Sequence, residues 1–217
     1  MENKLIKIVW QLRKYKNGVT ADNMTNRMLA YKINYGVPIV NIKEVAKLYE
    51  GDNALSMQLF ARPEREAKLA AIYITDEDKL TEKDINNIEK QIINNELAEH
   101  IVLRIIARMP NAVKYAIKWC KQNNNEFLQK AGWMTIGRIA INTDITEQKL
   151  GVFFELIGLA DFASAHVRAA LIFALPKLAL KSDNMKEKVK NWINKNIKSD
   201  DANIQYTANE INIFLAL

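Results

Sequence analysis

Cysteine and histidine are scarce in this chain of 217 residues, which contains only Cys120, His100 and His166 of these two types. One thiol cannot close a disulfide within the chain. Three such residues so far apart in the sequence also lack the spacing of a zinc site. We therefore expect no disulfide framework and no bound metal.

Long apolar runs are missing as well. The longest candidate, residues 169–180, contains Pro176 and Lys177 and falls short of the roughly 18 residues that a membrane helix requires. The N-terminus alternates lysine with apolar residues and has no small-residue cleavage site of a signal peptide. We expect a cytoplasmic protein without a membrane partner.

Glycine and proline are few, with 7 and 4 residues, and the polar breaks in the sequence fall where helices would have to end. This pattern favours many helices joined by short loops. The predicted helices cover residues 4–16, 21–31, 41–50, 53–61, 64–74, 82–93, 97–108, 112–121, 126–141, 147–158, 163–180, 186–196 and 203–215. No convincing pair of strands remains, so we predict an all-α fold.

Three local signals mark helix starts. Pro63 precedes a segment with acidic residues at 64 and 66, as is typical of a first helical turn. Thr81 and Asp84 have the spacing of a capping box. Asn111 stands directly before the predicted helix 112–121, where its side chain can cap the first turn.

A weak internal repeat is more informative than any single helix. Alanine recurs at positions 67, 98, 131, 169 and 208, which lie 31, 33, 38 and 39 residues apart. This period is close to that of HEAT-type helical hairpins, in which small residues let neighbouring helices approach closely. An ordinary helical bundle, which also places alanine at helix contacts, is the alternative. We predict a single domain, residues 1–217, built from HEAT-like repeats.

The net charge of +6 favours a polyanionic partner, because clustered lysine and arginine displace counterions from a phosphate backbone. Basic residues recur near the repeat positions. They are Arg65, Lys68, Arg104, Arg108, Lys130, Arg138, Arg168 and Lys177. If equivalent helices line one side of a superhelix, these side chains form a stripe that follows DNA; solvated surface is the alternative for each residue taken alone.

Tryptophan is the aromatic residue best suited to stacking on a base. Trp133 lies one helical turn from Lys130 and is our candidate for such a contact, with core packing as the alternative. For acid–base chemistry the best local group is Glu96, Glu99 and His100, since residues three or four apart share a helix face. Acids near a helix start also suit the helix dipole without any catalytic role.

Several motifs occur in a fixed order between about residues 20 and 180. They are Tyr31-Lys32-Ile33-Asn34-Tyr35-Gly36-Val37 followed by Ile42–Lys47, then Leu59-Phe60 with Arg65–Ala71, then Tyr115–Trp119, and finally Phe127–Gly132. In combination and order they resemble the DNA alkylation-repair (AlkD-like) family.

That resemblance implies a curved α-α superhelix of HEAT-like repeats that holds duplex DNA in a basic concavity. Active members hydrolyse the N-glycosidic bond of positively charged alkylated purines without a metal or organic cofactor, so we expect no cofactor. In the family, a Trp-Asp-x-x-Asp motif supplies a carboxylate that stabilises positive charge on the deoxyribose and positions water.

This chain departs from that motif. The matching segment is Ala98-Glu99-His100-Ile101-Val102. Val102 replaces the acid credited with catalysis, and Glu99 matches the first acid, which leaves it as the one candidate catalytic residue. Lys130 and Ile172 match positions where the family has an arginine and a tryptophan. The resemblance therefore favours DNA binding over glycosylase activity.

We predict a monomeric protein of this family that binds duplex, damaged or branched DNA, with weak, altered or absent glycosylase activity. One alternative is an alkylpurine DNA glycosylase in which Glu99 replaces the missing acid. Another is a HEAT-repeat scaffold for acidic protein partners. Salt-dependent DNA binding separates the first two from the third, and base release from alkylated DNA separates the first from the second.

Overall fold

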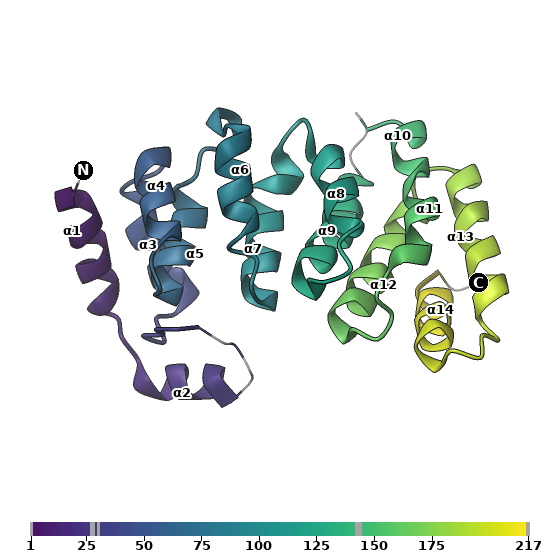
Figure 1. Ribbon diagram of the computed structural model, residues 1–217, viewed down its shortest axis with the longest axis horizontal. Helices are drawn as coiled ribbons and strands as arrows, with labels where there is room; N and C mark the ends of the chain where they lie inside the picture. Colours follow the sequence, from purple (N-terminus) through teal and green to yellow (C-terminus); the bar gives the residue numbers. More distant parts are fainter. Residues whose placement is uncertain (1, 27–28, 30, 142–144, 216–217) are drawn as a thin grey trace. The chain divides into compact units, whose positions relative to one another are not determined.

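The computed structural model describes every residue except 1, 27–28, 30, 142–144 and 216–217. Over the described residues the chain is helical, and the only β-type pairing is an isolated bridge between Ile33 and Glu64 (Figure 1). The all-α prediction is therefore confirmed. None of the described helices is long and apolar enough to cross a membrane.

The chain divides into two compact units, residues 1–109 and residues 110–217. A repeat stack divides readily, because each hairpin contacts only its neighbours. The single domain thus remains a prediction, and the two units are described separately.

In its described residues the first unit contains seven α-helices and two short 3-10 helices. They are α1 (Glu2–Arg13), α2 (Gly18–Asn26), α3 (Ile39–Lys47), α4 (Asn53–Phe60), α5 (Arg65–Ile74), η1 (Glu77–Lys79), α6 (Glu82–Glu89), α7 (Asn95–Arg104) and η2 (Ile106–Arg108). Helix α5 is the centre of this unit: it packs against α3, α4 and α7 and is buried along nearly its whole length. The exposed sides of α3 and α7 therefore flank a helix that is fixed in place by its packing.

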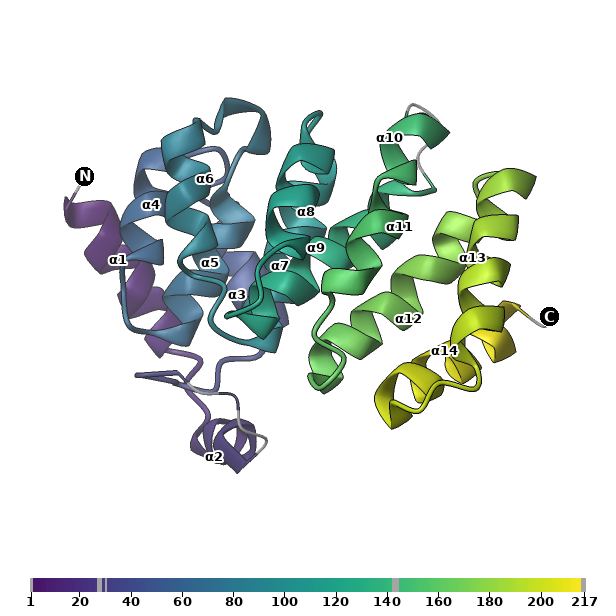
Figure 2. The same ribbon diagram turned by 45° about the vertical axis from the view of Figure 1, so that its right-hand side comes forward.

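The second unit contains the other helices. They are α8 (Ala112–Cys120), α9 (Glu126–Ile139), α10 (Glu147–Gly151), α11 (Phe153–Leu156), η3 (Ile157–Leu159), α12 (Ala165–Ala179), α13 (Asp183–Asn196) and α14 (Ala202–Leu215). Helix α9 packs against both α8 and α12, and α9 and α12 lie side by side in both views (Figure 2).

Two glycines allow these close approaches. A Cβ on Gly132 would lie 2.7 Å from the backbone nitrogen of Cys120 in α8, and a Cβ on Gly137 would lie 2.5 Å from the Phe173 ring in α12. Both distances are far below van der Waals contact, so each interface requires a residue without a side chain.

The repeat prediction holds for four of its five alanines. Ala67, Ala98, Ala131 and Ala208 are buried, whereas Ala169 is exposed. On α12 the buried side chains begin at Val167 and continue through Ala170, Leu171 and Ala174. The sequence alignment of the repeats was therefore one residue out of register on this helix.

Of the predicted helix starts, the capping box of Thr81 and Asp84 is present in full. The prediction for Asn111 is wrong, because its side chain makes no capping hydrogen bond. Helix α5 begins at Arg65, two residues after Pro63. The predicted helix 147–158 is interrupted and forms α10, α11 and η3 in succession. The predicted helix 21–31 runs beyond α2 into residues of which three, 27–28 and 30, lie outside the described part.

Candidate nucleic-acid interface

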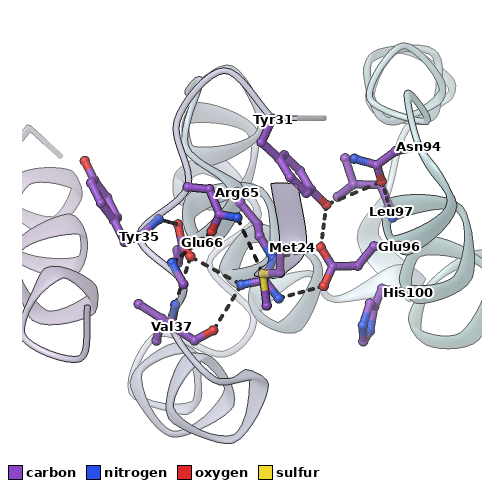
Figure 3. Close-up of polar contacts among 12 residues, drawn as sticks. Met24, Tyr31, Tyr35, Val37, Arg65, Glu66, Asn94, Glu96, Leu97 and His100 are labelled. Atoms are coloured by element: carbon purple, nitrogen blue, oxygen red, sulfur yellow. Dashed lines mark hydrogen bonds and ion pairs between the residues drawn. The ribbon is translucent and has the colours of Figure 1, made fainter. Parts of the chain in front are cut away.

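A buried ion-pair cluster joins α5, α7 and the segment before α3 (Figure 3). The Arg65 guanidinium donates from Nε and Nη2 to the Glu96 carboxylate at 2.8 and 2.6 Å, and the Tyr31 hydroxyl donates to the same carboxylate at 2.6 Å. Only 2% of the Arg65 side chain is exposed. Burial alone would raise the pKa of Glu96, but the hydrogen bonds and charge of Arg65 hold it below its ordinary value.

The same cluster fixes the segment that carries the first family motif. Glu66 accepts hydrogen bonds from the backbone amides of Tyr35 and Val37 at 3.2 and 3.1 Å, and Arg65 donates to the Val37 carbonyl at 3.0 Å. Between them Gly36 has φ 68°, and a Cβ there would lie 2.1 Å from the Asn17 carbonyl oxygen. This motif therefore has a structural function in the first unit, which glycine alone permits at position 36.

The acidic candidates of α7 occupy three different environments. Glu96 is held by Arg65, Glu99 is exposed and accepts a hydrogen bond from Asn95 at 3.0 Å, and Val102 is buried in the core. A carboxylate that stabilises a cationic sugar has to be desolvated and free of a neutralising partner. Within the Glu96, Glu99 and His100 group, Glu96 lacks the second property and Glu99 the first.

Tyr73 of α5 is surrounded by positively charged and imidazole side chains. Lys43 of α3 lies 5.2 Å and Arg104 of α7 lies 5.4 Å from the centre of its ring. Its hydroxyl is 2.8 Å from His100 Nδ1. Burial raises the pKa of Tyr73, so the hydroxyl keeps its proton at neutral pH. Lys43, Lys47, Tyr73, Arg104 and Glu50 line a groove of about 290 Å³.

In the second unit, α9 and α12 present basic and aromatic side chains together. Arg138 of α9 and Lys177 of α12 lie 5.3 and 4.8 Å from the centre of the Phe173 ring, which rests against Gly137. At the other end of the pair, the rings of Phe127 and His166 are 5.0 Å apart. We call the group Arg138, Phe173 and Lys177 the α9/α12 face. Cations beside a partly exposed ring are the chemistry that binds single-stranded and unpaired nucleic acid.

Four predicted DNA contacts require correction. Trp133 is 0% exposed and packs against Phe153, so its ring cannot stack on a base. Arg65 is bound to the two carboxylates described above. Lys68 is buried and donates to the Phe60 carbonyl and to Gln91. Lys130 is also buried, at 6% exposure, and has an interaction partner of its own. In each case the side chain that the sequence assigned to DNA is buried within the protein.

The other predicted basic residues differ in how much of their charge is neutralised. Arg108 forms an ion pair with Glu77 at 2.7 Å. Arg168 donates to the Phe162 and Ala163 carbonyls at 2.6 and 2.9 Å and so holds the loop before α12. Arg104 and Arg138 take part in no ion pair among the described residues.

Sequence reasoning missed Lys43, Lys47 and Tyr73 in the first unit and the packing of Phe173 in the second. Lys43 and Lys47 are four residues apart on α3, a spacing that puts both on one helix face. That spacing is the signal available in the sequence, but α3 lies outside the alanine repeat that indicated the other basic residues.

Comparison with known proteins agrees with the geometry. The chain matches the DNA alkylation repair enzyme family over residues 8–199. No curated protein matches it significantly. A solved structure has the same fold, with a TM-score of 0.73 and 16% identity over 97% of this chain and 94% of the other. That protein is described as one of a new family related to the HEAT-like repeat DNA glycosylases, with affinity for branched DNA structures. The chain thus has a HEAT-like repeat fold and belongs to the DNA alkylation repair enzyme family.

Proposed function

We propose that this protein binds DNA, with a preference for branched or otherwise distorted DNA, and that the α9/α12 face is a principal contact. The observation that carries the proposal is the pair of cations, Arg138 and Lys177, beside the partly exposed ring of Phe173. Cations bind phosphates of any sequence, while a ring offers a stacking surface to bases that are not fully paired. Branch points and lesions expose such bases.

Family membership and the structural neighbour's affinity for branched DNA support the same proposal. We further propose that the protein acts as a monomer in the cytoplasm.

Glycosylase activity is proposed to be weak or absent. Val102 lies in the core at the position of the missing acid, Glu96 is neutralised by Arg65, and Glu99 is exposed to water. Removing a cationic alkylated purine requires a carboxylate that faces the sugar in a desolvated site. None of these three residues meets that requirement.

The first experiment compares binding of a four-way junction and of a duplex of equal length by fluorescence anisotropy. We expect tighter binding of the junction. Phe173→Ala should lower junction affinity by about tenfold, as expected for loss of one stacking contact of roughly 1–3 kcal/mol. It should lower duplex affinity less.

Lys186→Gln serves as the matched control for Arg138→Gln and Lys177→Gln. Lys186 is exposed on α13 in the same unit, so its substitution removes the same charge from a residue that does not belong to the α9/α12 face. Equal losses in all three variants would show that only net charge matters and would reject this face. Rapid release of methylated purine by the native protein, abolished in Glu99→Gln, would reject the proposal on catalysis.

A further inference from the structure

We propose that the groove around Tyr73 in the first unit is a binding site for a single phosphate group, formed by Lys43 and Lys47 of α3 and Arg104 of α7. The site is separate from the α9/α12 face. The proposal depends on the proposed function in one respect only. If the protein binds DNA, the phosphate group in this site is a phosphodiester of the bound strand.

The first argument is uncompensated charge. Three cations line the groove, and none of them forms an ion pair within the described part of the chain. Glu50 is the one carboxylate among the described residues that line this groove. The adjoining pocket shares Glu50, Tyr73 and Arg104 and adds three carboxylates, of which Asp76 and Glu77 are paired with Lys79 and Arg108. Like charges held close together repel one another, and a bound anion removes that repulsion.

The second argument is an unused donor. Arg104 lines the groove, and within the described part of the chain no atom accepts a hydrogen bond from its Nε, although its guanidinium is held 5.4 Å from the centre of the Tyr73 ring. Arginine in the last turn of a helix interacts favourably with the helix dipole, but that interaction leaves Nε unsatisfied. The guanidinium is therefore not committed to a protein acceptor, and a phosphate can accept from it with the bidentate geometry that a carboxylate also offers.

The third argument is the rigidity of the site. Tyr73 belongs to the buried helix α5, its hydroxyl is hydrogen-bonded to His100 of α7, and Lys43 and Arg104 both lie against its ring. Pre-positioned donors lose little conformational entropy when they bind. The flexible side chains of Lys43 and Lys47 complete a site whose central residues, Tyr73 and Arg104, are already in position.

His100 gives the site a built-in reporter. It lies beside Tyr73, with Lys43 on α3, Arg65 on α5, and Glu96 and Glu99 on its own helix as the charged groups that act on it. A phosphate bound in the groove that Tyr73 lines brings negative charge near His100 and favours the imidazolium, so phosphate binding should raise the pKa of His100. The chain has one other histidine, His166 in the second unit, which serves as the internal control.

The test is a proton NMR titration of the two histidines with and without inorganic phosphate. We expect phosphate to raise the pKa of His100 and to leave that of His166 unchanged. Arg104→Gln and Lys43→Gln should each weaken phosphate binding on the order of 10-fold, the loss expected for one charge-assisted hydrogen bond. Lys90→Gln, which removes an exposed charge from the end of α6, should have no effect.

The site is overturned by a His100 pKa that does not respond to saturating phosphate, or by an equal response of His100 in Arg104→Gln. Far-ultraviolet circular dichroism of each variant confirms that it is folded. An equal loss in Lys90→Gln would also overturn it, since net charge would then explain the binding.

A second arm identifies the source of the phosphate. A short oligonucleotide with ordinary phosphodiesters should raise the pKa of His100, whereas the same oligonucleotide with uncharged methylphosphonate links should not. A response to inorganic phosphate but not to the oligonucleotide would contradict the assignment to DNA. If His100 responds to the oligonucleotide while α9/α12 variants bind DNA normally, the phosphate site stands and the proposed α9/α12 contact fails.

Discussion

Arg65 and Arg104 belong to the same predicted stripe of basic residues and lie in the same unit, yet their surroundings are opposite. Arg65 is 2% exposed and donates to Glu96, Glu66 and a backbone carbonyl. Arg104 is half-buried against Tyr73, and among the described residues it forms no ion pair and its Nε has no hydrogen-bond partner. Arg65 thus holds two helices and a loop together, while Arg104 is still able to bind a ligand. A basic residue is therefore a candidate for ligand binding according to its partners, and its place in a repeat does not decide this.

The largest effect should come from substituting Arg65, the arginine whose charge is neutralised by carboxylates. Arg65→Gln leaves the buried Glu66 and the half-buried Glu96 without their cation, and removing one member of a buried ion pair costs about 3–5 kcal/mol. Urea unfolding followed by circular dichroism measures the loss.

The same substitution at Arg104 is the matched control. It removes a cation–π contact at a half-buried site, worth about 1–2 kcal/mol. Equal destabilisation by the two variants would contradict the distinction between them.

An intermediate effect is expected at the two glycines of α9. Gly137→Ala and Gly132→Ala each force a methyl group into a contact below 3 Å, and such overpacking costs about 1–3 kcal/mol. Only Gly137→Ala displaces the Phe173 ring. Both variants should lose stability, and Gly137→Ala alone should also lose junction affinity when binding is measured well below the unfolding temperature. A similar loss of affinity in Gly132→Ala would separate DNA binding from the position of Phe173.

The smallest effect concerns pH. Burial, together with the charges of Lys43 and Arg65, holds the pKa of His100 below its ordinary value, although Glu96 and Glu99 oppose this. The unfolded chain therefore takes up a proton near pH 6.5 that the folded chain does not, so stability declines as the pH falls through this value. His100→Gln should flatten the stability profile between about pH 7 and 5.5. A profile identical to that of the native protein would show that His100 does not contribute.

Saturating phosphate should flatten the same profile in the native protein. A bound phosphate raises the pKa of His100 in the folded state and so removes its difference from the unfolded state. This result would connect the pH effect at His100 with the phosphate site that Arg104 helps to form.

The sequence was sufficient for the fold, because helical segments, scarce glycine and the alanine period are local properties. Burial of Ala67, Ala98, Ala131 and Ala208 follows from that period. Ala169 failed because a one-residue shift is invisible in a weak repeat but turns a helical side chain by about 100°. The break in helix 147–158 falls at Gly151, where α10 ends, and glycine is a weak helix former.

The site was less predictable, because a side chain's partners lie far away in the sequence. Arg65 meets Glu96 across 31 residues, and Lys68 meets Gln91 across 23. No rule of sequence spacing distinguishes an arginine with a carboxylate partner from Arg138, which lies beside the Phe173 ring of α12. Family motifs are limited in the same way. The segment around Gly36 identifies the family correctly, but its function in the structure is to anchor a loop.

The salt dependence of junction binding tests the central claim most directly. Affinity is measured from 50 to about 200 mM salt for the native protein, the double variant Arg138→Gln with Lys177→Gln, and Lys186→Gln. Each lost phosphate contact lowers the slope of log affinity against log salt by about 1, so the double variant should lose about 2 and Lys186→Gln nothing. An unchanged slope in the double variant, or an equal change in the control, would contradict the account.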